Sequence, residues 1–272
     1  MYNAIKLLAI SLLVATISTS CSNSKDRNEA ARELLAEAES MRECHDYEAA
    51  IALLDSVDRV YRDCIAERKD GTKIRIQTLI DLSTDSLQLG ESRRESRQKM
   101  IDSLSSKFIT VSMPGTRGYR TIKAVFTGNE MSGSFIQARI DENDYFTLVI
   151  NNAGKRINLT GIEYGVNVAT GKSVYMEGSE MMSLRQETVQ GLVNAVTNVG
   201  LGSISVELVG EKGRTSIKLT ERDIQAWRDT WLYSMLLQEK RHDDINYEKY
   251  MAGIEKLQGQ LDALNAEEAT KE

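Results

Sequence analysis

The sequence has little proline, phenylalanine and histidine, and no surplus of basic charge. Its 272 residues include 1 proline, 4 phenylalanines and 2 histidines. Because proline ends or kinks helices, a chain whose only proline is Pro114 favours long uninterrupted helices over a loop-rich enzyme. The net charge is −6 and the two signs are interspersed. Binding to a phosphate backbone needs a concentrated basic surface, so we expect no nucleic-acid partner.

Cysteine is also scarce: the sequence contains only Cys21, Cys44 and Cys64. An exported chain could form a Cys44–Cys64 disulfide, since export leads to an oxidising compartment. We expect Cys44 at the turn of a helical hairpin and Cys64 near the far end of its second helix. The intervening helix would separate them by about 27 Å, whereas a disulfide needs Cα atoms roughly 4.4–6.8 Å apart. This geometry predicts two free thiols.

Sequence motifs of catalysis are absent as well. The chain has no Gly-x-Ser-x-Gly elbow, no phosphate-binding loop and no His-Glu-x-x-His pair. Gly200-Leu-Gly202 lacks the third glycine of a dinucleotide site, and we expect His45 and His242 to be surface histidines. We therefore predict no enzyme, no catalytic residue, no metal site and no cofactor. A hydrolase whose site follows no motif stays as a remote alternative.

The N-terminal segment has the pattern of an export signal. Lys6 precedes an apolar stretch from Leu7 to Ile17. A membrane-spanning helix needs about 20 apolar residues, so this stretch is too short to span but fits the hydrophobic part of a signal peptide. Small residues, Ser18–Ser20, then lead to Cys21. We predict a signal peptide over residues 1–20 and a polar tether over residues 21–27.

The same residues resemble the lipobox of bacterial lipoproteins, in which small residues end at a cysteine that is lipidated. Ser18 stands where leucine is usual, a looseness similar to lipoboxes of the Bacteroidetes. The resemblance implies acyl chains such as palmitate on Cys21 and a cell-envelope location, which we expect to be the outer membrane. The periplasmic or surface face stays open, because Asp26 is flanked by Lys25 and Arg27 rather than by an acidic run. Ordinary cleavage without lipid is the other reading.

Residues 28–43 and 46–68 are both amphipathic with a helical period, and the short link between them predicts an antiparallel hairpin. The hairpin resembles one tetratricopeptide repeat, through Leu34, Ala38, Met41, Asp46, Tyr47, Ala50, Leu54 and Val57. No second copy follows at a period of about 34 residues, so a plain helical hairpin is the favoured reading. With its Ala-Leu-Leu-Asp-Ser stretch (residues 52–56), the chain is also similar to uncharacterised envelope lipoproteins of the Bacteroidetes.

Two long helical regions are predicted on either side of a β-rich part. After a turn at Lys69-Asp70-Gly71, the first runs from about Lys73 to Ser106, with a possible kink at Gly90. The second begins at Thr220, which Asp223 would cap. Its last part has an apolar residue at every third or fourth position, which is typical of a coiled coil; these residues are Tyr247, Tyr250, Ile254, Leu257, Leu261 and Leu264. If the two regions pair, Met100 and Leu104 would meet Trp227 and Trp231, and the arginines at 93–97 would meet Glu239 and the acidic residues 243–244.

The middle of the chain alternates with a period of two and contains several turn sequences. The expected strands lie at 119–126, 134–140, 145–150, 157–159, 174–176, 204–208 and 215–219. Glu211-Lys212-Gly213 should form a hairpin between the last two. A helix is expected to open at Ser183 with Gln186 completing a capping box. Met181, Met182 and residues 114–118 are expected to be loop surface.

Together these patterns predict an α+β fold. It comprises a helical hairpin and long helix (28–106), a central antiparallel β-rich module with one helix (107–219), and a long C-terminal helix or coiled coil (220–268). We predict a membrane-anchored scaffold or interaction protein, attached through Cys21, with a protein partner or self-association through the C-terminal helix. Candidate partner-facing residues are Trp227, Trp231, Tyr247 and Tyr250. A peptide- or glycan-binding module of the envelope is the alternative.

Overall fold

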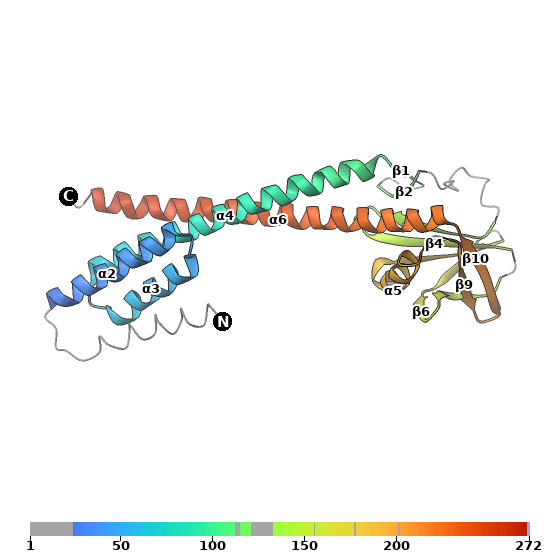
Figure 1. Ribbon diagram of the computed structural model, residues 1–272, viewed down its shortest axis with the longest axis horizontal. Helices are drawn as coiled ribbons and strands as arrows, with labels where there is room; N and C mark the ends of the chain where they lie inside the picture. The colour runs from blue at the N-terminus through green and yellow to red at the C-terminus, as the bar shows by residue number, and fades with distance from the viewer. Residues whose placement is uncertain are drawn as a thin grey trace. The chain divides into compact units, whose positions relative to one another are not determined.

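The computed structural model describes residues 24–111, 115–120, 133–154, 156–176, 178–200 and 202–270. The fold is α+β, as predicted, with helices and two antiparallel sheets (Figure 1). Two compact units divide the chain: one is Gly90–Asn246, and the other joins the residues up to Leu89 with Tyr247–Glu272. Cys21 and the predicted signal peptide lie outside the described residues. None of the helices in the described part is both long and apolar enough to cross a membrane.

The first unit opens with the predicted helical hairpin, formed by α2 (Ser24–Glu43) and α3 (Tyr47–Val60). Asp46 caps α3 by accepting a hydrogen bond from the Ala49 N–H at 3.3 Å. The facing sides of the two helices form an apolar cluster of Leu35, Ala38, Leu53, Leu54 and Val57. The amphipathic period of both segments therefore predicted the hairpin and its core correctly.

The third helix begins earlier than the sequence suggests. α4 (Ile65–Ser105) starts directly after a short bend, so the predicted extension of the second helix to residue 68 and the turn at Gly71 are wrong. The chain bends at Tyr61–Cys64 instead, where Tyr61 and Cys64 are buried against Ala31. Gly71 is a helical residue, and a Cβ there would lie 3.1 Å from Leu35 Cδ2. The glycine thus serves close helix packing rather than a turn, and α4 also continues through Gly90.

Ion pairs show how α4 lies against the hairpin. Arg32 of α2 contacts Glu67 at 3.0 Å, and Arg42 contacts Asp81 at 2.6 Å, so α2 and α4 run in the same direction. α3 runs the other way, since its first residue, Tyr47, donates to Asp85, whereas Asp58 near its end contacts Arg68 at 3.4 Å. The three helices therefore pack together, and ion pairs join their polar sides.

The second unit contains both sheets. The six-stranded sheet has the order β1-β2-β3-β4-β8-β7, and the four-stranded sheet has the order β10-β9-β5-β6. Their bounds are β1 (Phe108–Thr110), β2 (Arg117–Tyr119), β3 (Phe135–Ile140), β4 (Phe146–Ala153), β5 (Leu159–Tyr164), β6 (Asn167–Thr170), β7 (Ser173–Met176), β8 (Ser179–Arg185), β9 (Ile204–Gly210) and β10 (Gly213–Leu219). The predicted hairpin at 211–213 is confirmed, since Gly213 pairs with Gly210.

The core of this unit joins both sheets to α5 (Gln186–Thr197) and to the start of α6 (Glu221–Ala269). α5 contributes Val189, Leu192, Val193 and Val196, all buried, and Trp227 of α6 is fully buried in the same cluster. Figure 1 shows α5 beside β4 and β6. Thr220 and Asp223 cap α6 as predicted, because the Thr220 N–H donates to Asp223 Oδ2 at 2.7 Å.

Three predictions within the β-rich part need correction. The helix does not open at Ser183: β8 extends to Arg185, and Ser183 pairs with Val149 of β4. Met182 is a core residue with 2% exposure rather than loop surface. The alternation of a buried strand and the amphipathic period of a helix are hard to tell apart over such a short run. Gly118, expected as loop surface, lies in strand β2. Pro114 and residues 121–126 of the expected first strand lie outside the described residues.

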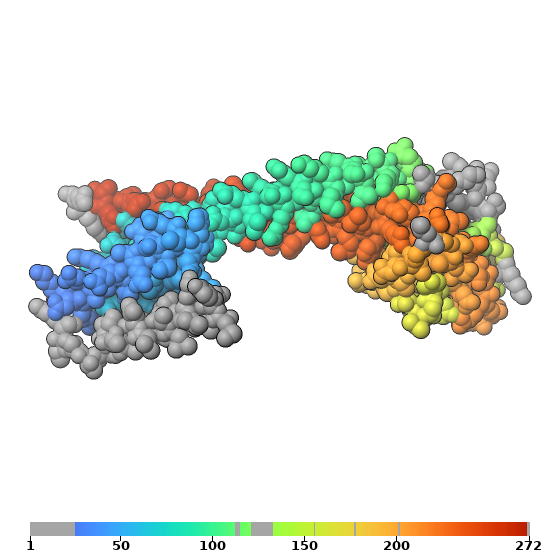
Figure 2. Space-filling view, viewed as in Figure 1, coloured from blue at the N-terminus to red at the C-terminus, as the bar shows by residue number. Residues whose placement is uncertain are grey.

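Within the second unit, α4 and α6 lie side by side, and their surfaces meet in Figure 2. The predicted charge match is present: Arg94 contacts Asp244 at 2.8 Å, and Arg97 pairs with Glu239 and Asp243. The predicted apolar match is wrong, because Leu104 clusters with Tyr233 and Leu236. The two tryptophans belong to the opposite side of α6, which faces the sheets.

In the first unit, α4 and α6 are also joined by charge. Glu268 pairs with Lys69 at 3.1 Å and with Lys73. The predicted coiled-coil positions Ile254, Leu257, Leu261 and Leu264 are half-buried, while Ile76 and Ile80 of α4 are buried. Pairing of the two helices thus occurs within one chain in this structure.

Candidate functional site

The predicted lipid-attachment residue, Cys21, lies outside the described residues, so the structure adds no geometry to it. Cys44 and Cys64 are free thiols, as predicted, although Cys64 lies in the bend before α4 and not in a helix. Cys44 is exposed and Cys64 is buried. Burial raises the pKa of the Cys64 thiol, and the neighbouring Asp63 and Glu67 carboxylates raise it further. Cys64 is therefore a core residue with a weakly ionised thiol.

The four candidate partner-facing aromatics do not share one surface. Trp227 has 0% exposure and lies in the core, so it cannot face a partner; this part of the prediction is wrong. Trp231 is half-buried and packs edge-to-face on Phe146, with ring centroids 5.1 Å apart. Tyr247 is half-buried, and Tyr250 is exposed at 44%. An i, i+4 spacing identified adjacent rings, but it could not show that this face of the helix meets the sheets.

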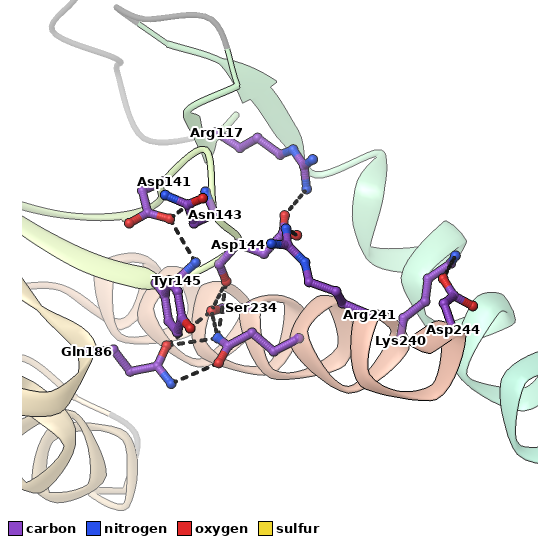
Figure 3. A network of polar contacts seen from close by, with 11 residues as sticks. Arg117, Asp141, Asn143, Asp144, Tyr145, Gln186, Ser234, Lys240, Arg241 and Asp244 are labelled. Atoms are coloured by element: carbon purple, nitrogen blue, oxygen red, sulfur yellow. Dashed lines mark hydrogen bonds and ion pairs between the residues drawn. The ribbon is translucent and has the colours of Figure 1, made fainter. Parts of the chain in front are cut away.

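One polar network joins the turn between β3 and β4 to α6 (Figure 3). Asp144 has a positive φ of 68°, a conformation that aspartate adopts more readily than most residues. Its backbone carbonyl accepts hydrogen bonds from Ser234 Oγ at 2.6 Å and from Gln238 Nε2 at 3.1 Å. Its carboxylate faces Arg117 of β2 at 3.5 Å and Arg241 of α6 at 2.5 Å. The network therefore ties three elements together at the tip of one turn.

The local sequence prepares this turn. Asp141 Oδ1 accepts from the N–H groups of Asn143 and Tyr145, both at 2.9 Å, which closes an Asx-type turn. Gln186, which the sequence suggested as a helix cap, instead accepts from the Phe146 N–H at 3.0 Å and from Gln238 Nε2 at 2.9 Å. These donors and acceptors hydrogen-bond to one another, so the network holds the turn and α6 together as part of the fold.

A second network surrounds Asp229, a carboxylate with 6% exposure on α6. It accepts from the Tyr119 hydroxyl at 2.7 Å, from Lys107 Nζ at 2.9 Å and from Gln225 Nε2 at 2.9 Å. Burial, together with the hydrogen bond to Asp229, raises the pKa of Tyr119 to about 12. Sequence reasoning missed Asp229, because a single acidic residue in an amphipathic helix reads as solvated surface.

A polar cleft of about 250 Å³ lies at the turn of the helical hairpin. Tyr47 donates its hydroxyl hydrogen to Asp85 Oδ2 at 2.5 Å, and His45 Nδ1 lies 2.7 Å from both of these oxygens. Since the tyrosine hydroxyl already donates to Asp85, the His45 contact to the carboxylate requires hydrogen on Nδ1. The other lining residues are Arg42, Glu43, Asp81 and Thr84. His45, expected as a plain surface histidine, is thus part of a cluster that the turn and α4 bring together.

The electrostatics of this cleft follow from its hydrogen bonds. Burial raises the pKa of Tyr47 to about 12, and the hydrogen bond to Asp85 adds to the effect. The hydrogen bonds from Tyr47 and His45 hold the pKa of Asp85 below its usual value. At neutral pH the cleft therefore presents a protonated tyrosine and an ionised aspartate, which can hold a polar ligand group. Across the described residues, no group of three His, Cys, Asp or Glu side chains is arranged to hold a metal ion.

Comparison with protein-family models, with curated proteins and with solved structures found no match to this chain.

Proposed function

We propose that this protein is a cell-envelope lipoprotein, anchored through acyl chains on Cys21, that acts as a non-enzymatic scaffold or interaction protein. The observation that carries the proposal is the run from Leu7 to Ile17 followed by Ser18–Ser20 and Cys21. Each buried CH₂ of an acyl chain contributes about 0.8 kcal/mol to membrane binding, and two or more chains give stable anchoring. An outer-membrane location is part of the proposal.

The described part of the chain supports a structural role. Its buried carboxylates Asp229 and Glu180 each accept hydrogen bonds from other elements and so act as joints within the fold. The polar groups at the cleft near His45 also bind one another, since the Tyr47 hydroxyl donates to Asp85. Exposed apolar side chains supply the contact surface that an interaction protein needs, and they include Tyr250 and Met251 of α6.

Metabolic labelling tests the anchor. Cells expressing the full chain would be fed an alkyne fatty acid, and the label on the purified protein would be compared between wild type and Cys21→Ala. Cys44→Ala is the matched control, since Cys44 is an exposed thiol that the proposal leaves unmodified. We expect label in wild type and in Cys44→Ala, with none in Cys21→Ala. Equal label in all three proteins would refute lipidation at Cys21.

A peptide- or glycan-binding module is a second candidate function, favoured by the polar cleft at His45 and by the exposed ring of Tyr250. The burial of Trp227 removes the residue best suited to stack on a sugar. Crosslinking in native membranes would compare wild type with Tyr250→Ser and Asp85→Asn. A partner lost only in Asp85→Asn would favour binding at the cleft, and one lost only in Tyr250→Ser would place the contact on α6.

A further inference from the structure

Strand β7 forms one edge of the six-stranded sheet. It pairs with β8 on one side, and the described residues provide no strand on its other side. Three consecutive side chains on it are exposed: Val174 at 60%, Tyr175 at 44% and Met176 at 61%. An apolar strand with an unpaired edge offers both backbone hydrogen bonds and apolar contact to another chain.

The direction of the free backbone groups follows from the hairpin. Met176 and Ser179 face each other in the register of β7 and β8, and two positions separate them along the chain; in an antiparallel hairpin with this spacing the flanking pair is hydrogen-bonded. Bonded and non-bonded pairs alternate along an antiparallel ladder, so the Tyr175–Glu180 pair is non-bonded. The N–H and C=O of Tyr175 therefore point away from β8, toward the open edge.

The edges of the four-stranded sheet are protected, in contrast to β7. β10 carries Arg214 and Lys218, and Arg214 pairs with Glu207 at 2.8 Å. At the opposite edge β6 packs against α5, where a Cβ on Gly191 would lie 3.1 Å from Asn167 Oδ1. Charges and covering helices are the usual devices against unwanted strand pairing. β7, with the sequence Ser-Val-Tyr-Met, has no charge of its own.

Two cations lie close to β7 in space or in sequence. The guanidinium of Arg156 lies 4.7 Å from the centre of the Tyr175 ring, and the exposed Lys172 directly precedes β7. Within the part of the chain that the structure describes, neither forms an ion pair with a carboxylate. An incoming strand with acidic side chains would neutralise both cations, whereas a basic strand would be repelled.

A second copy of this chain fits the edge less well. Stable protein interfaces bury about 1,200–2,000 Å², and a pair of such short strands covers far less. Two copies would also bring their Arg156 and Lys172 side chains near one another. An extended peptide segment needs only the strand edge and the adjoining side chains, as in known strand-addition complexes.

We propose that the open edge of β7 binds an extended segment of a partner protein, with alternating acidic and apolar residues, by strand addition. This inference rests on the proposed role as an interaction protein and names the chemistry of its partner. The Tyr175 backbone would bind the segment, Val174 and Met176 would supply apolar contact, and Arg156 and Lys172 would select for acidic side chains.

Fluorescence anisotropy with the full chain in detergent tests the proposal. The probes are fluorescein-labelled Asp-Val-Asp-Val-Asp-Val and its Lys-Val-Lys-Val-Lys-Val counterpart. We expect the acidic peptide to bind at least about tenfold more tightly than the basic one. Tyr175→Pro, which removes only an outward N–H from the backbone, should weaken binding by about tenfold or more. Tyr175→Thr keeps the N–H and should remain within about threefold of wild type.

Further variants guard against misfolding and a different site. Arg156→Glu combined with Lys172→Glu should reverse the preference between the two peptides. Lys218→Glu on β10 is the matched control and should leave binding unchanged. Equal affinity for both peptides, no binding at all, or full binding by Tyr175→Pro would overturn the proposal, as would a dimer that Tyr175→Pro dissociates. Fatty-acid labelling is read separately, so failure here is distinguishable from failure of the anchor.

Discussion

Glu180 is a carboxylate with 1% exposure that joins the two sheets of the second unit. It lies on β8 and accepts from the Leu159 N–H at 2.5 Å, from Ser173 Oγ at 2.8 Å and from the Ile157 N–H at 3.1 Å. Burial opposes ionisation, yet these hydrogen bonds outweigh it and hold the pKa of Glu180 below its ordinary value. A carboxylate whose pKa is lower in the folded state stabilises the protein at pH values above its unfolded pKa. This contribution to the free energy of unfolding is lost as the pH falls through the folded pKa.

Glu180→Gln tests this contribution at the residue scale. The amide can still accept from Leu159, but its NH₂ group faces the Ile157 N–H, so two donors meet. We expect a loss of about 1–3 kcal/mol in the free energy of unfolding at pH 7. The difference from wild type should narrow as the pH falls below about 4.3, the usual glutamate pKa. Urea unfolding followed by tryptophan fluorescence measures it, with the exposed Glu142→Gln as control; a difference that stays constant with pH would contradict the account.

At the scale of elements, the pairing of α4 with α6 in the second unit combines an apolar cluster with ion pairs. Ile101 and Leu104 of α4 are buried with Tyr233 and Leu236 of α6. Beyond this cluster, Arg97 pairs with Glu239 and Asp243, and Arg97 has a side-chain exposure of only 16%. Burial provides the attraction between the helices, and the ion pairs set which positions face one another.

Charge reversal measures how far the ion pairs specify this alignment. Arg97→Glu places a carboxylate against two others and should destabilise the protein by about 1–2 kcal/mol. Combining it with Asp243→Arg restores one opposite pair, so we expect recovery of about half of the loss. Thermal unfolding of the two single variants and the double variant gives the coupling. Strict additivity would show that Arg97 and Asp243 do not interact, and the exposed Lys249→Glu serves as control for a change of net charge.

At the scale of the whole molecule, α4 and α6 each contribute one part to each compact unit. The second unit contains both sheets, α5 and their shared core, and all members of that core lie between Ile136 and Trp227. The first unit takes the last part of α6, which Glu268 ties to Lys69 and Lys73. The stability of the second unit should therefore be independent of the C-terminal residues, while that of the first should not.

Deletion of residues 247–272 tests this division. Hydrogen exchange read by mass spectrometry should be unchanged in β3, β4 and β8, because their core lies wholly within the second unit. Exchange should become faster in residues 65–89 of α4, since Lys69 and Lys73 would lose their ion pairs with Glu268 of α6. Deletion of residues 270–272, which follow α6, is the control. Faster exchange throughout the sheets would contradict the division.

Much of the fold follows from local patterns. Apolar residues with a period of 3.6 predicted the helices α2, α3 and α6. Alternation of apolar and polar residues, with a period of two, predicted the strands β3, β4, β9 and β10. The placement of the arginines at 93–97 near Glu239 and residues 243–244 was also predicted, because charges along two antiparallel helices can be matched from the sequence. The helix expected at Ser183 failed, since a short apolar run satisfies both periods and only its neighbours decide between them.

The candidate sites were less predictable than the fold. By itself, the sequence determined the export-like segment, the Cys21 context and the amphipathic faces, because each of these depends on residues close together in the chain. Only the tertiary structure decided that Trp227 is core, that Gly71 is a packing residue, that His45 meets Asp85, and that β7 has an open edge. These features depend on which segments distant in sequence lie together, and burial, unlike periodicity, is a property of the assembled surfaces.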